Sequence, residues 1–241
     1  MIFEFLIVSL VALTLGSFGN NVISYYSQSS PFDLFRSKCP CCKKELTFSE
    51  LIPVFSFILQ KGRCSECSFR ISIRYLFVEL STLGIGLFVY GLLGFEFSTH
   101  LVFLILYVLL LISVIDYYSL IIPNLLVFVL LLLTGYLLII KTENLLESIA
   151  VSMLIGFILS ALQLFYKNSK NKIVLGYGDI KLVFVLSLLL NLVDNLFAIW
   201  FSSLIALIAV ISINIKNLNE LKEIKIPFGL YLSIGFAVMI L

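Results

Sequence analysis

Long apolar runs recur along almost the whole chain, and they constrain its fold more than any other feature. Hydrophobic residues make up 61% of the 241 residues, and charged residues only 12%. A soluble domain is about 45–50% apolar and about 25% charged. Because a membrane-spanning helix needs roughly 20 mostly apolar residues, the runs predict an all-α polytopic membrane protein with about eight transmembrane helices.

The expected spans follow from the positions of these runs. They cover about residues 2–25, 76–94, 100–116, 121–140, 148–166, 180–194, 196–214 and 227–241. The pair 180–194 and 196–214 also allows a different division. The first run carries Glu4 and has neither a basic region nor an A-x-A-like cleavage site, so we interpret it as a retained span and not as a cleaved signal.

The positive charges predict the orientation of these spans. The loops at about 26–75, 117–120, 167–179 and 215–226 share one side of the membrane, and both termini lie on the other. These loops and their margins hold every lysine and arginine except Lys141. Since positive residues stay in the cytoplasm, this side is predicted to be cytoplasmic. Asp116 and Asp179 both fall at that face.

These two aspartates stand at the ends of apolar runs, where a carboxylate is costly and usually marks a site. Asp116 ends one run, and Asp179 closes a G-x-G-D string before another. Two carboxylates that share one proton can cleave a peptide, with one acting as base and the other as acid. The alternative is that each aspartate is an interfacial cap or a solvated loop charge.

The neighbours of Asp179 suit a catalytic loop. Gly176 and Gly178 allow a close backbone approach to a substrate. Lys181 lies near enough to bias the local field, although it does not share the helical face of Asp179. The sequence therefore favours a carboxylate pair supported by Gly176, Gly178 and Lys181.

The first predicted loop carries two C-x-x-C pairs. Cys39 and Cys42 form one pair, Cys64 and Cys67 form the other, and Cys41 is an additional thiol. The spacing resembles a zinc ribbon, in which four thiolates bind one tetrahedral ion. A cytoplasmic loop disfavours structural disulfides. A structural Zn²⁺ site is therefore predicted, with a redox pair or a set of free cysteines as the alternatives.

Three parts are expected along the chain. Residues 1–25 form the first span, residues 26–75 the cytoplasmic, zinc-ribbon-like cysteine loop, and residues 76–241 a core that carries both aspartates. The apolar run 51–59 is too short to span, and it is expected to pack on the membrane surface or on the zinc lobe. Nothing in the sequence resembles a phosphate loop or a nucleic-acid surface, so the expected surroundings are the lipid bilayer and no nucleic acid.

The ordered set of motifs resembles the prepilin peptidase family, the type IV prepilin leader peptidases that are often also N-methyltransferases. The G-x-G-D string alone is a weak signal, whereas the ordered set runs across most of the chain. The matching positions are Gly16-Ser17-Phe18 with Asn20, Cys39-Pro40 with Cys42 and Leu46, Ile52-Pro53-Val54, Gly62-Arg63-Cys64 with Cys67, Ile71-Ser72, Tyr75 with Glu79, Asp116 with Ile122-Pro123, Gly176-Tyr177-Gly178-Asp179 with Lys181, and Ile226-Pro227-Phe228-Gly229.

The resemblance implies an aspartyl endopeptidase whose catalytic pair is Asp116 and Asp179. Such enzymes cleave the short basic leader from prepilin or pseudopilin precursors at the cytoplasmic face of the bacterial plasma membrane. Many then methylate the new N-terminal amine with S-adenosylmethionine, an activity linked with the cysteine loop. Glu79, an acid inside the second span, could hold the amine or the cofactor; the alternative is a pairing with Arg74.

Three positions depart from the family's pattern. Asn124 stands where an acidic residue is common, Tyr25 where an arginine often follows the first span, and Leu76 where a proline is frequent. Asn124 is not one of the two aspartates. Tyr25 and Leu76 bear on methylation and leave the peptidase interpretation intact.

Two other classes of function compete with this one. A membrane thiol–disulfide oxidoreductase would use the two C-x-x-C pairs, but it needs them on the oxidising side, which the charge distribution opposes. A transporter that relays protons would place carboxylates in the middle of its spans, whereas Asp116 and Asp179 fall at the predicted inner boundary.

Overall fold

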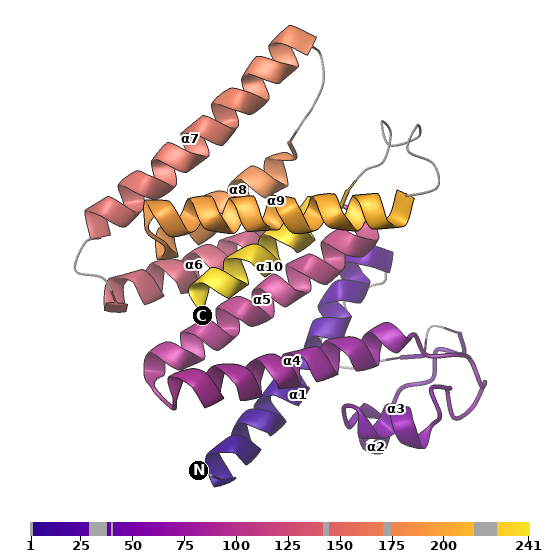
Figure 1. The fold of residues 1–241 in the computed structure, drawn as a ribbon. Helices are drawn as coiled ribbons and strands as arrows, with labels where there is room; N and C mark the ends of the chain where they lie inside the picture. Colours follow the sequence, from indigo (N-terminus) through magenta and orange to yellow (C-terminus); the bar gives the residue numbers. More distant parts are fainter. Residues whose placement is uncertain (1, 29–37, 40, 142–144, 171–174, 215–225) are drawn as a thin grey trace. The chain divides into compact units, whose positions relative to one another are not determined.

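The computed structural model describes residues 2–28, 38–39, 41–141, 145–170, 175–214 and 226–241, and outside the cysteine loop these are mostly helical (Figure 1). Two isolated β-bridges in the cysteine loop are the β-structure found in the described residues. The chain forms two compact units, Met1–Phe95 and Glu96–Leu241.

The first unit pairs two long helices and inserts the cysteine loop between them. Its helices are α1 (Ile2–Gln28), α2 (Phe48–Leu51), α3 (Phe55–Leu59) and α4 (Ile73–Leu93). The hydroxyl of Ser72 caps α4 by accepting the Arg74 N–H at 3.3 Å. Gly94 ends α4 at a φ of 75°, a backbone conformation that favours glycine.

A close approach and polar bonds join α1 to α4. A Cβ built on Gly16 would lie only 2.8 Å from the Cα of Glu79, so the two backbones meet where α1 has no side chain. The buried Asn20 donates from Nδ2 to the carbonyl of Tyr75 at 3.0 Å, and the Ser24 and Tyr75 hydroxyls lie 3.2 Å apart. Residues that matched the family pattern on both helices therefore meet at one contact.

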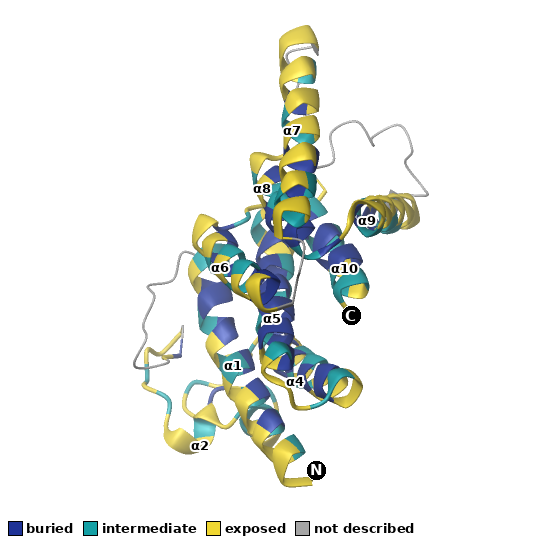
Figure 2. Ribbon diagram, turned by 90° about the vertical axis from the view of Figure 1, so that its left-hand side faces the viewer, coloured by how far each residue is buried: buried dark blue, intermediate teal, exposed yellow. Residues whose placement is uncertain are grey.

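The second unit is built around α5. Its elements are α5 (Phe97–Ser119), α6 (Asn124–Lys141), α7 (Leu145–Lys170), α8 (Tyr177–Leu186), the 3₁₀ turn η1 (Ser187–Leu189), α9 (Leu192–Asn214) and α10 (Phe228–Ile240). Helices α6 and α10 pack on α5, which is buried along most of its length, whereas α7 is largely exposed (Figure 2). The buried face of α5 includes Ile105, Ile112 and Ile115.

The all-helical fold is confirmed, but the count of eight spans is not. Helices occupy all eight predicted positions, yet five of those in the described residues are long and apolar enough to cross a membrane: α1, α4, α5, α7 and α9. Helices α6 and α10 are shorter apolar helices. The orientation stays a prediction, because several cations that it uses (Arg36, Lys172, Lys216, Lys222 and Lys225) lie outside the described residues.

The predicted span 180–194 is not one continuous helix, because a side chain bonds to the backbone where α8 ends. The α-helix ends after Leu186 and continues as the single turn η1. The buried amide of Asn195 then donates to the carbonyls of Ser187 at 3.2 Å and Leu190 at 2.9 Å. A side chain therefore takes up carbonyls that a continuing helix would bond, and α9 begins at Leu192.

Candidate functional site

Asp116 lies in the last turn of α5 and faces the start of α10. Its carboxyl is buried, and Oδ2 accepts the Leu230 N–H at 3.1 Å. A Cβ built on Gly229 would lie 3.0 Å from the same oxygen, so a larger residue there would press on the carboxylate. The N-terminus of α10 carries a partial positive charge. The Leu230 N–H and the helix end therefore offset part of the cost of burying a charge on Asp116.

Asp179 lies in the first turn of α8, directly after the glycine turn. The helix has Gly176 as its N-cap, which makes Asp179 the third helical residue. The Asp179 carboxyl points back toward Gly176, since a Cβ atom built on Gly176 would lie 2.7 Å from Oδ2 of Asp179. This is the side-chain direction of a capping box. Gly176 thus leaves room for the carboxyl.

The two aspartates come from segments distant in the second unit's sequence and converge around Ile122. A Cβ built on Gly178 would lie 3.4 Å from Ile122 Cδ1, and one built on Gly229 would lie 2.8 Å from the same atom. One methyl group therefore touches both the segment that carries Asp179 and the segment that binds Asp116. The structure brings the predicted pair together.

The electrostatics differ between the two carboxyls. Burial, together with the charge of Asp116, raises the pKa of Asp179 from 3.8 to about 6. Like charges in a poorly hydrated site cannot both ionise easily. Asp179 therefore keeps its proton to a higher pH than an ordinary aspartate does, while the backbone N–H of Leu230 supports a charge on Asp116.

Asp179→Asn should make the fold more stable at high pH only. The folded-state pKa lies above the ordinary value, so the wild type loses stability as the pH rises from 3.8 to about 6. We expect the variant to melt at a higher temperature than the wild type at about pH 8, and at nearly the same temperature at about pH 4. Melting of the protein in detergent measures this, and an equal gain at both pH values would contradict it.

Lys181 has a structural bond that the sequence did not indicate. Its Nζ donates to Oδ1 of Asn124 at 3.1 Å, which ties the first turns of α8 to the first residue of α6. Asn124 is the position where the sequence departs from the family pattern. Asn124 therefore lies next to the candidate site, and its bond to Lys181 links α6 to the helix that carries Asp179.

Sequence reasoning missed Gln163. This side chain of α7 is 1% exposed, and its Oε1 accepts the N–H of Leu175, the residue just before the glycine turn, at 3.0 Å. On the same stripe of α7, Ser152 donates to the carbonyl of Phe184 at 2.7 Å. Helix α7 thus bonds to the segment just before α8 and to the C-terminal part of α8. The position of Gln163, a polar residue inside an apolar run, was the sequence signal that could have identified it.

The four predicted cysteines form one cluster in the first unit. All four sulfur atoms lie within 4.8 Å of one another, with Cys39 and Cys67 at 3.7 Å and Cys42 and Cys64 at 3.9 Å. Sulfurs at the corners of a zinc tetrahedron lie about 3.8 Å apart, given a Zn–S bond of about 2.3 Å. The exposed Cys41 is not part of the set.

The two C-x-x-C segments repeat one backbone shape. In each, the first cysteine accepts a bond from the residue four positions later: the Lys43 N–H in one case at 2.9 Å and the Ser68 N–H in the other at 3.0 Å. Lys43 and Ser68 also share a left-handed φ, 58° and 56°. The N–H groups of Cys67 and Glu66 lower the pKa of the Cys64 thiol to about 7. Both segments therefore turn their sulfur atoms toward one point, as a metal site requires.

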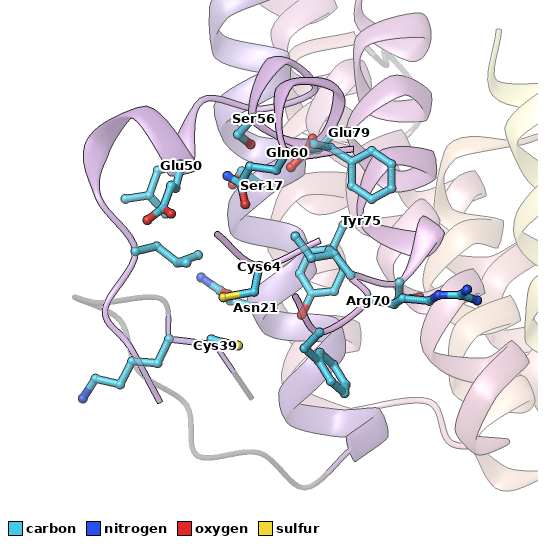
Figure 3. Close-up of a pocket in the computed structure, with 17 residues that line it drawn as sticks. Ser17, Asn21, Cys39, Glu50, Ser56, Gln60, Cys64, Arg70, Tyr75 and Glu79 are labelled. Atoms are coloured by element: carbon cyan, nitrogen blue, oxygen red, sulfur yellow. The ribbon is translucent and has the colours of Figure 1, made fainter. Parts of the chain in front are cut away.

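A cavity of about 450 Å³ lies beside this cluster (Figure 3). Its polar wall is formed by side chains of α1, the cysteine loop and α4, which include Ser17, Asn21, Glu50, Ser56, Gln60, Tyr75 and Glu79. Cys39 and Cys64 lie at its edge. The cavity is large enough for a small organic ligand.

Glu79 is buried at one end of this cavity. Its Oε2 accepts the backbone N–H of Val54 at 2.7 Å. Arg74, the alternative partner suggested by the sequence, donates from Nη2 to the hydroxyl of Ser24 at 2.6 Å. The structure therefore places Glu79 against the cysteine loop and the cavity.

Comparison with known proteins agrees with both units. The family described as the bacterial peptidase A24 N-terminal domain matches residues 10–93, and the type IV leader peptidase family matches residues 103–211. A prepilin leader peptidase/N-methyltransferase of Vibrio cholerae is 30% identical over 82% of each chain. One of Aeromonas salmonicida is 31% identical over 95% of this chain and 88% of its own. One of Bacillus subtilis is 36% identical over 49% of this chain and 48% of its own. No solved structure matches.

Proposed function

Because this chain belongs to the type IV leader peptidase family, we propose that it is a membrane aspartic endopeptidase that removes the short basic leader from prepilin or pseudopilin precursors. The relatives are named as prepilin leader peptidases, which supports type IV prepilin processing. The observation that supports the aspartic mechanism is that the segments carrying Asp116 and Asp179 converge at Ile122, close enough for the charge of Asp116 to act on Asp179.

The surroundings of the two carboxyls support a different proposed role for each. Asp116, which accepts the Leu230 N–H, is the ionised base and takes a proton from the attacking water. Asp179, with its raised pKa, is the acid and donates its proton toward the scissile carbonyl or the leaving amine. After cleavage Asp116 carries the proton and Asp179 is ionised, so the two carboxyls must exchange protons with water before the next cycle.

The proposed substrate is a helix that must open before it can be cut. The precursor carries its basic leader in front of an apolar helix, which enters the second unit near the ends of α5 and α8. A helical peptide bond is shielded by its own hydrogen bonds, so local unwinding is required. We place the cut bond at the cytoplasmic face of the bacterial plasma membrane, on the side with the excess of positive residues.

The test is cleavage of a purified precursor in detergent. Wild-type protein and a pilin-like precursor are incubated, and the products are measured by intact mass. Removal of the leader at a single bond supports the proposal. A precursor that stays uncut at equal levels with and without the enzyme would exclude this substrate class.

Gln163→Met should slow cleavage without weakening substrate binding. The variant keeps the volume of the side chain but leaves the Leu175 N–H without its acceptor, which loosens the glycine turn. We expect kcat to fall about ten-fold or more, since small displacements of reacting groups are costly, and KM to stay unchanged. Gln163→Glu, which retains an acceptor, should recover most of the rate.

Ser160→Ala is the matched control for this prediction. The Ser160 hydroxyl donates to the Gly156 carbonyl within α7 at 2.7 Å, so its removal deletes a polar bond of the same helix without touching the turn. Equal losses of rate in Gln163→Met and Ser160→Ala would show that Gln163 acts only through the stability of α7.

A second activity, methylation of the new N-terminus, is proposed for the first unit. The relatives are named as N-methyltransferases as well as peptidases. The cavity beside the cysteine cluster has the size for S-adenosylmethionine, and buried Glu79 provides a charge for a cationic amine or sulfonium. In this proposal the loop 26–75 serves methylation, and the peptidase core lies within 76–241.

The cysteine cluster is proposed to hold a structural Zn²⁺. The four sulfurs already lie at the separations of a zinc tetrahedron. Cys39, Cys42, Cys64 and Cys67 would bind the ion, and the ion would fix the loop that lines the cavity. The convergence of all four thiols on one point also favours a metal over two separate redox pairs, so the oxidoreductase alternative is not favoured.

Glu79→Gln should separate the two activities. Glutamine keeps an acceptor for the Val54 N–H but removes the negative charge from the cavity. We expect methylation of the cleaved pilin to fall about 30-fold or more, since losing one partner of a buried charge pair costs about 2 kcal/mol or more. Cleavage should be retained. Radiolabelled methyl transfer measures the first, and unchanged methylation would remove Glu79 from that activity.

A further inference from the structure

The short helix α3 has one face that lines the cavity of the first unit and one face that is exposed. Ser56 and Phe57 line the cavity of the first unit. Phe55, Ile58 and Leu59 are turned away from it and are 62%, 61% and 80% exposed. A cluster of large exposed apolar side chains usually marks an interaction surface. The outer face of α3 therefore requires a partner, whereas its inner face already has a role.

A hydrogen bond to Glu79 fixes the position of α3 along the axis of α4. Its Oε2 holds the N–H of Val54, the residue just before α3. Glu79 lies in the second turn of α4, about 9 Å from the helix start at Ile73 for a rise of about 1.5 Å per residue. Helix α4 is long and apolar enough to cross a membrane. The start of α3 is thus held beside the first turns of a spanning helix.

The turn before α3 has an unusual backbone conformation that a hydrogen bond to Glu79 holds in place. Val54 has φ 64° and ψ −53°, and the Phe55 N–H bonds to the Pro53 carbonyl at 2.6 Å. This is a γ-turn with a positive φ at a β-branched residue, a combination that is rare and strained. Such strain persists where the surroundings fix it, and here the Glu79 bond does so.

Other exposed side chains near this end of α4 and just after α3 have the chemistry of a membrane interface. On α4, Ile73 and Phe77 are exposed apolar side chains at the end of the helix that Glu79 occupies. After α3 come the exposed Lys61 and Arg63. Apolar side chains that insert, followed by cations that meet anionic headgroups, are typical of segments lying in the plane of a membrane surface.

We propose that Phe55, Ile58 and Leu59 insert into the headgroup–acyl boundary of the bilayer beside α4, so that α3 separates the cavity from lipid. The occupant of this face is the lipid surface itself. The sequence left the run 51–59 either on the membrane or on the zinc lobe, and the geometry favours the membrane. The proposal stands whichever reaction the cavity serves, because it concerns the position of α3 only.

Quenching of a single tryptophan by lipid tests this position. The chain contains one tryptophan, Trp200, so Trp200→Phe gives a silent background. The full chain with Ile58→Trp is reconstituted in vesicles of equal parts phosphatidylglycerol and phosphatidylcholine. Bromine is placed on the phosphatidylcholine acyl chains, either near the carbonyl end or near the methyl end. Glu66→Trp, at an exposed position of a cysteine segment, is the control for the water side.

We expect bromine near the carbonyl end to remove about half or more of the fluorescence of Ile58→Trp, since interfacial segments lie only about 5–10 Å deep. Bromine near the methyl end should quench it less. Glu66→Trp should respond to acrylamide in water and to neither lipid. Leu59→Trp, on the same face, is a second reporter should Ile58→Trp fail to fold.

Two results would overturn the proposal. Quenching of Ile58→Trp by acrylamide, without quenching by either lipid, would place α3 in water. Protection from acrylamide and from both lipids would show that protein covers this face, as in a dimer of the chain. Glu79→Ala adds an independent check, because loss of the Val54 bond should increase acrylamide quenching of Ile58→Trp.

Discussion

Asp116→Asn and Asp179→Asn should each lower the rate of prepilin cleavage by about 10²–10⁴-fold, the range that general acid–base catalysis contributes. Asparagine keeps the shape of each side chain, so the packing around Ile122 should survive. Each variant is compared with the wild type for melting temperature and oligomeric state, which separates a loss of chemistry from a loss of fold. Intact-mass measurement of the precursor over time gives the rate.

The double variant sharpens this prediction. Because the proposed mechanism uses the two carboxyls as one proton-sharing pair, removing both should cost little more than removing one. Asp194→Asn, which changes an aspartate in the first turn of α9, is the matched control and should cleave at the wild-type rate. Cleavage that survives either single substitution would remove that aspartate from the mechanism, and the proposed family activity would then need another catalytic group.

Cys64→Ser should release the metal and unfold the cysteine loop. Binding free energies of structural zinc sites are about 10–16 kcal/mol, so a loop with little core of its own would depend on the proposed Zn²⁺. We expect loss of stoichiometric zinc, faster proteolysis within residues 38–72, and loss of methylation. The loss of cleavage should be smaller, because both aspartates lie in the second unit.

Cys41→Ser is the control that separates a metal site from general thiol chemistry. Cys41 is exposed and lies outside the cluster of four sulfurs. The variant should keep its zinc, its protease resistance and its methylation. If Cys64→Ser retains zinc, or if both variants lose it equally, the four-cysteine site is wrong. Metal content of the purified protein decides between these outcomes.

The helical plan was predictable because lipid imposes it locally. Each apolar run is long enough to show in the sequence, and helices appear at all eight predicted positions. The division at 180–194 was less predictable. The end of α8 depends on the Asn195 side chain, which bonds carbonyls that precede it by several residues. Hydropathy reflects burial in apolar surroundings and does not reflect such a bond.

The candidate site residues could also be recognised in the sequence, because they are costly where they stand. Asp116 and Asp179 interrupt apolar runs, and the paired cysteines have a spacing that is typical of metal sites. What each residue bonds was not predictable. The contacts of Asp116 with the Leu230 N–H, of Gln163 with the segment before the glycine turn, and of Glu79 with Val54 join segments distant in sequence.

The sequence by itself therefore determined the membrane class, the approximate helices, the two aspartates and the four cysteines, since each leaves a local signature in composition or spacing. Only the tertiary structure decided that the Leu230 N–H bonds Asp116, that α7 bonds to α8 and to the segment before it, and that Glu79 holds the turn before α3. The physical reason is that hydrogen bonds between distant segments depend on how helices pack, and packing is a property of the folded chain.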